Sequence, residues 1–78
     1  MTRKIESICD PVDENVIYWV AWSAKDNPDC DPWAREELLH RVFRDDRREK
    51  GAQPISEAMS RDEAYKLLGQ MALLFKGS

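Results

Sequence analysis

The 78-residue chain lacks the features by which most catalytic and metal-binding proteins are identified from sequence. Its three glycines are dispersed, so it contains no glycine-rich phosphate-binding loop. Its two cysteines, Cys9 and Cys30, form no Cys-x-x-Cys pair, and the single histidine, His40, has no obvious nucleophile as a partner. We therefore expect no enzymatic activity, no metal site and no cofactor.

Long apolar runs are also missing. No segment approaches the roughly 20 apolar residues that a membrane-spanning helix needs. The first six residues include Arg3 and Lys4 but are not followed by the apolar region of a secretory signal, so the cytoplasm is the expected compartment. Three Trp, two Tyr and two Phe argue against disorder, and the length predicts one domain over residues 1–78.

The strongest local pattern lies at the C-terminal end. Ser60 and Glu63 form a capping box, in which each side chain can satisfy a free backbone amide at a helix start. Apolar residues then recur at spacings of three and four up to Phe75, and Gly77 is a typical stop signal. This pattern predicts an amphipathic helix over about residues 61–76.

A second helix is predicted for about residues 31–49. Asp31 and Pro32 are favoured at the N-cap and first position of a helix. Behind them the apolar residues follow helical spacing and are succeeded by a wholly charged stretch, residues 44–50. We expect the last turns of this helix to project into solvent.

The first third of the chain allows two interpretations. Asp10 and Pro11 repeat the helix-start pattern and favour a helix over residues 11–25. Residues 16–22, however, are rich in β-branched and aromatic side chains, so residues 4–9 and 16–22 could instead form a hairpin. The helical interpretation predicts an all-α fold of three helices, and the alternative is an α+β fold with an N-terminal β-hairpin followed by two helices. For the three-helix fold we expect a core of Leu38, Leu39, Val42, Leu67, Leu68, Met71 and Phe75.

Two surfaces are candidates for binding a partner. If residues 11–25 are helical, Tyr18 and Trp22 lie on a different face from Trp19, and a three-helix domain can hardly bury both faces. Exposed aromatic side chains anchor many interfaces, although both rings could also pack against the third helix. The second surface is an arginine-rich helix face over Arg41–Arg48, interrupted by acids. The predicted partner-binding residues are Tyr18, Trp22, Asp26, Asp29, Arg44 and Arg48.

Three functions remain in contention. The first is a non-enzymatic inhibitor or adaptor that binds a protein or nucleoprotein complex through an acidic and aromatic surface. Small size, acidity and the lack of motifs resemble the general profile of phage-encoded inhibitors of host defence, anti-CRISPR proteins among them. The second is a small nucleic-acid-binding regulator using Arg41–Arg48, which the net charge of −3 makes less favourable. The third is a self-assembling structural subunit, and a homodimer would suit so small a core.

Overall fold

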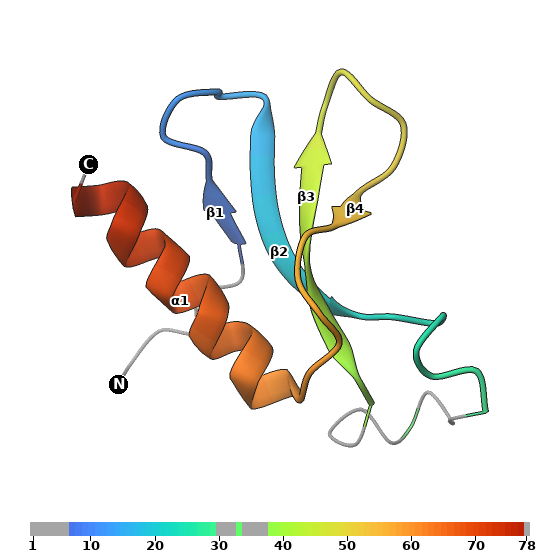
Figure 1. The fold of residues 1–78 in the computed structure, drawn as a ribbon. Helices are drawn as coiled ribbons and strands as arrows, with labels where there is room; N and C mark the ends of the chain where they lie inside the picture. Colours follow the sequence, from blue (N-terminus) through green and yellow to red (C-terminus); the bar gives the residue numbers. More distant parts are fainter. Residues whose placement is uncertain (1–6, 30–32, 34–37, 78) are drawn as a thin grey trace.

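The described part of the chain folds into one antiparallel sheet covered on one side by one helix (Figure 1). The computed structural model describes residues 7–29, 33 and 38–77. The elements within these residues are β1 (Ser7–Cys9), β2 (Val16–Trp22), β3 (His40–Asp46), β4 (Gln53–Pro54) and α1 (Arg61–Gly77). Sheet order follows chain order, β1-β2-β3-β4, so every strand pairs with its sequence neighbour.

The prediction of an all-α, mainly helical chain is therefore wrong, and the α+β alternative is closer. The segment that could have been a helix over 11–25 instead contains β2, which forms a hairpin with β1 in the register Cys9↔Ile17. The alternative also expected two helices after the hairpin, whereas α1 is the one helix in the described residues. The C-terminal helix predicted for 61–76 is confirmed as Arg61–Gly77.

The predicted helix over residues 31–49 is also wrong in its second half. Residues 40–46 form β3, which pairs with β2 over seven residues, from Val16↔Asp46 to Trp22↔His40. Most of the first half, including the Asp31-Pro32 start signal, lies outside the described residues. On the outer side of β3, Met59 exchanges both backbone hydrogen bonds with His40, and Ser56 Oγ accepts the Val42 amide. This pairing satisfies backbone groups that would otherwise form an open sheet edge.

The side chains predicted to cap the helix starts at Asp10 and Ser60 have two different outcomes. Asp10 Oδ1 accepts the amides of Val12 and Asp13 at 2.8 and 3.0 Å, but these amides belong to the turn between β1 and β2. An aspartate can bond the amides two and three residues ahead in a turn as well as at a helix N-cap. At α1, by contrast, Ser60 Oγ accepts the Glu63 amide at 3.3 Å, as the capping box predicts.

The core lies between α1 and the near face of the sheet. Val16, Tyr18, Val42 and Leu68 form its buried centre, and partly buried side chains of β1, β2 and α1 pack around them. Leu38 is buried as predicted, but Leu39 is 39% exposed and was wrongly assigned to the core. The reason is the period of two of an extended chain, which turns Leu39 away from the side that buries Leu38.

Candidate functional site

The strand β2 carries apolar side chains on both of its faces. Val16, Tyr18 and Val20 face α1 and belong to the core. Because successive side chains of a strand point to opposite faces, Ile17, Trp19 and Ala21 point away from α1. A strand in a sheet with one solvated face normally alternates apolar and polar residues, whereas runs that are apolar throughout are typical of strands covered on both faces.

The strand register extends this second surface across the sheet. Phe43 lies opposite Trp19, Asp45 opposite Ile17, and Arg41 opposite Ala21. We call the surface the open face, and its residues are Ser7, Cys9, Ile17, Trp19, Ala21, Arg41, Phe43, Asp45 and Pro54.

The open face is not covered by any other strand or helix of the described chain. The helix α1 packs on the opposite side, where its Leu68 joins Val16, Tyr18 and Val42 in the core (Figure 1). Ile17, Trp19, Ala21 and Phe43 are half-buried, and Cys9 and Pro54 are exposed. The centre of the face is therefore an apolar patch with Trp19 and Phe43 side by side on adjacent strands.

The two charged residues of the open face differ in their surroundings. Arg41 donates from Nε and Nη2 to the two carboxylate oxygens of Asp26, at 2.5 and 3.0 Å, and from Nη1 to the Ser56 carbonyl. Hydrogen bonding to Arg41 lowers the pKa of Asp26 to about 2, and the same contact raises the pKa of Arg41. Within the described chain Asp45 has no hydrogen-bonding or ion-pair partner for its carboxylate.

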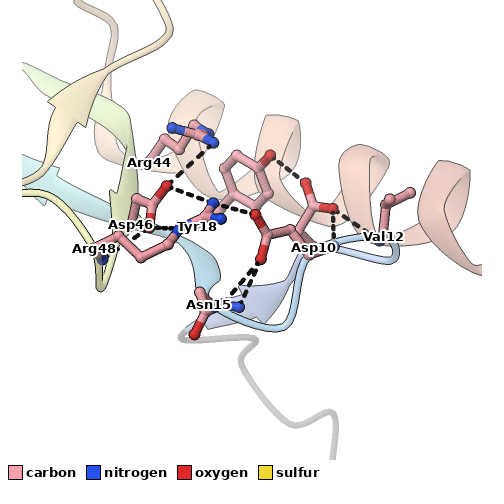
Figure 2. A network of polar contacts seen from close by, with 8 residues as sticks. Asp10, Val12, Asn15, Tyr18, Arg44, Asp46 and Arg48 are labelled. Carbon is pink, nitrogen blue, oxygen red and sulfur yellow. Dashed lines mark hydrogen bonds and ion pairs between the residues drawn. The ribbon is translucent and has the colours of Figure 1, made fainter.

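A second polar cluster lies at the end of the sheet where the β1–β2 and β3–β4 turns meet (Figure 2). The Tyr18 hydroxyl donates to Asp10 Oδ2 at 2.7 Å, and Arg48 binds both Asp13 and Asp46. Its Nη2 lies 2.9 Å from Asp46 Oδ2. Each carboxylate is thus matched by a donor, and the cluster fastens the two turns to each other.

The charged groups of this cluster have hydrogen-bonding or ion-pair partners within the chain. The hydrogen bonds from Arg48 lower the pKa of Asp46 to about 2, and the Tyr18 hydroxyl lowers the pKa of Asp10. Burial, reinforced by Asp10, raises the pKa of Tyr18. Because the guanidinium groups are already paired with carboxylates, the cluster suits a structural role better than the binding of a phosphate.

The paired aspartates predict loss of stability in acid. Asp26 and Asp46 have folded-state pKa values of about 2, whereas an unfolded aspartate titrates near about 3.9. The unfolded chain therefore binds more protons between these values, so the stabilisation is complete above about pH 4 and is lost as the pH falls towards about 2.

Urea unfolding at pH 7, 5, 4, 3 and 2 should show this fall in stability. The Asp46→Asn variant should be less stable at pH 7 and less sensitive below pH 4, and an equal acid dependence in both proteins would contradict the assignment.

The predicted partner-binding residues do not form one site. Tyr18 is 8% exposed, with its ring centroid 5.5 Å from that of Phe75, so little of it can reach a partner. Trp22 is 44% exposed at the end of β2, next to His40 of β3. Asp26 and the exposed Asp29 lie at that end of the sheet, whereas Arg44 and Arg48 lie at the other.

The helix face proposed for Arg41–Arg48 does not exist. On β3, Arg41 and Arg44 point to opposite faces, and Arg48 belongs to the turn that follows. Trp19 and Phe43, the central pair of the open face, were not among the predicted partner-binding residues, because helical spacing placed each of them on an apolar helix face. The signal that could have found them is the period of two in residues 16–22 and 40–46.

Other chemistry has little support in the described residues. They contain no group of three His, Cys, Asp or Glu side chains that could hold a metal ion, and no helix among them is long and apolar enough to cross a membrane. The buried His40 ring lies with Nδ1 2.7 Å from the Leu38 carbonyl, which accounts for it as a structural residue. Comparisons with protein-family models, with curated proteins and with solved structures find no match to this chain. The geometry of the open face is therefore the feature of this structure that bears on function.

Proposed function

We propose that this protein is a non-catalytic protein-binding module, of the adaptor or inhibitor type, and that the open face is its contact surface. The observation that carries the proposal is the apolar character of β2 on both faces, of which α1 covers one. Trp19 and Phe43 supply the large aromatic side chains that carry much of the binding energy at protein interfaces.

The chemistry of the open face favours a protein over a nucleic acid. Single-stranded nucleic acids also stack on aromatic residues of a sheet, but their binding sites combine those residues with unpaired positive charge. Here Asp26 balances the charge of Arg41, Asp45 would repel a phosphate, and the whole chain has a net charge of −3. A protein partner can cover the apolar centre and offer a cation to Asp45.

The test is capture by a tagged chain. Nuclease-treated lysate of the native host and, separately, an untagged copy of the chain are passed over the wild-type protein, the Phe43→Ser variant and the Leu73→Ser variant. Burial of a phenylalanine is worth about 1.5–3 kcal/mol, so Phe43→Ser should lower the captured amount of a specific protein by about tenfold or more. Leu73 is exposed on α1, away from the open face, and its substitution should leave capture unchanged.

Circular dichroism and thermal unfolding must first show that both variants are folded. Capture that survives Phe43→Ser, or that is lost equally in Leu73→Ser, would contradict the proposal. In a parallel capture from lysate that has not been treated with nuclease, recovery of nothing but nucleic acid would contradict the proposal as well.

A further inference from the structure

We infer that the open face packs against the open face of a second copy of this chain, with the two β3 strands running in opposite directions. The inference rests on the proposed function and names the partner. The observation behind it is the arrangement of charge on β3. Arg41 lies two residues before Phe43 and Asp45 two residues after it, and all three side chains point to the open face.

This arrangement is complementary to itself. Consider a two-fold axis that lies between the two sheets, at right angles to β3 and level with Phe43. This axis places Arg41 of each copy over Asp45 of the other and brings the two Phe43 rings together. Such a contact is isologous and closes at the dimer. Arg41 retains donors for it, because a guanidinium has five N–H groups and the described contacts use three of them.

The pairing also supplies what each copy lacks. Asp45 lies beside Ile17 with no cation bound to it by the described residues, and the opposed Arg41 would provide one. The half-buried Ile17, Trp19 and Phe43 would become the inner side of a two-sheet sandwich, in which the sheets lie about 10 Å apart. Each sheet would then be covered on both faces, by α1 of its own chain on one and by the sheet of the second copy on the other.

The size of the face determines the expected affinity. The strands β2 and β3 have seven residues each and are about 23 Å long, whereas β1 has three residues and β4 two. With neighbouring strands about 4.8 Å apart, the sheet presents roughly 300 Å² per copy. Two such faces bury less than the 1,200–2,000 Å² typical of stable complexes. The dimer is therefore weak, and we expect a monomer–dimer equilibrium with a midpoint in the range of about 10 µM to 1 mM.

Sedimentation velocity over that concentration range tests the inference. In the Asp45→Lys variant, a lysine faces Arg41 in each of the two symmetric contacts. Because like charges repel, the dissociation constant of the dimer should rise at least about tenfold. Glu49→Lys changes the charge equally on the exposed β3–β4 turn, off the open face, and should shift the constant less than about twofold. A chain that is monomeric at about 1 mM, or a dimer that tolerates Asp45→Lys, would overturn the inference.

Cross-linking provides a measurement that does not depend on how Asp45→Lys folds. In a Cys9→Ser, Cys30→Ser background, a Ser7→Cys variant should be joined to itself by a bismaleimide spanning about 10 Å, the expected distance between stacked sheets, because the exposed Ser7 lies in the same row of the open face as Trp19 and Phe43. A Leu73→Cys variant on α1 should remain uncross-linked, and the reverse pattern would overturn the inference. If the chain proves monomeric but Phe43→Ser still abolishes capture of a lysate protein, the second copy is excluded while the proposed function stands.

Discussion

Replacing Leu68 with alanine is expected to lower the free energy of unfolding by about 2–5 kcal/mol, the range for truncating a buried leucine. Leu68 is 0% exposed and joins α1 to Val16, Tyr18 and Val42, so its removal leaves a cavity between the helix and the sheet. Since a domain of this size has a stability of only several kcal/mol, this one change should remove much of it. Urea unfolding followed by circular dichroism measures the loss.

Leu74→Ala is the matched control for this prediction. Leu74 lies on the same helix and loses the same atoms, but it is 71% exposed. We expect a change within about 0.5 kcal/mol. Equal losses in the two variants would show that α1 does not pack on the sheet through Leu68, and they would remove the basis for calling the opposite side the open face.

The part of the fold that could be predicted from the sequence is the part that forms locally. For α1, the cap at Ser60, the apolar spacing and the glycine stop agree, and the helix begins and ends within a residue of the prediction. No residue outside the helix is needed to recognise it. The same holds for the hydrogen bonds of Asp10, whose tendency to bond nearby amides was recognised, although the hairpin turn that uses them was only the alternative interpretation.

The strand β3 could not be identified in the same way, because its pattern fits two periods. Leu38 and Val42 are four residues apart, which suits one face of a helix and also one face of a strand. The choice is made by pairing with β2, a contact between segments about twenty residues apart that no local pattern shows. An aspartate and a proline before the segment favoured the helix, and tertiary pairing overrode that preference.

The error in period changed the candidate site as well as the fold. Under helical spacing, Trp19 shared a face with Val16 and Val20, while Tyr18 lay on the face predicted to bind a partner. A strand separates the same residues by their alternation, so Tyr18 is buried against α1 and Trp19 lies on the open face. An incorrect period therefore exchanges the inner and outer aromatic residues, and any site inferred from it changes too.

The ion pair between Asp26 and Arg41 could be predicted from the sequence only in part. Asp26 was predicted to face a partner because of its acidic surroundings, but it binds Arg41 across fifteen residues of chain. The contact depends on the turn that follows β2, which returns Asp26 to the side of β3 that carries Arg41. Its consequence is that the acidic segment is less available to a basic partner than its composition suggests, and the apolar centre of the open face becomes the stronger candidate.

The second large effect is expected at Asn27, which fixes the start of the β2–β3 connection. Its side-chain Nδ2 donates to the carbonyls of Ser23 and Leu39, and its Oδ1 accepts the Leu39 amide, each at 2.8 Å. Both carbonyls keep a backbone donor, because the Ser23 amide binds Leu39 and the Asp26 amide binds Ser23. In Asn27→Ala the Leu39 amide is therefore the group left unsatisfied.

Loss of these three hydrogen bonds should lower the free energy of unfolding by about 1.5–3 kcal/mol, most of it from the orphaned amide. Asn27→Asp keeps an acceptor for that amide but places a carboxylate against two carbonyls, so it should not restore stability. Asp29→Ala changes an exposed side chain of the same segment and should stay within about 0.5 kcal/mol of the wild type. Urea unfolding of the three variants separates these cases, and amide hydrogen exchange at Leu39 should accelerate in Asn27→Ala alone among the alanine variants. If Asn27→Ala is as stable as Asp29→Ala, the side chain of Asn27 does not hold the end of β2 to the start of β3.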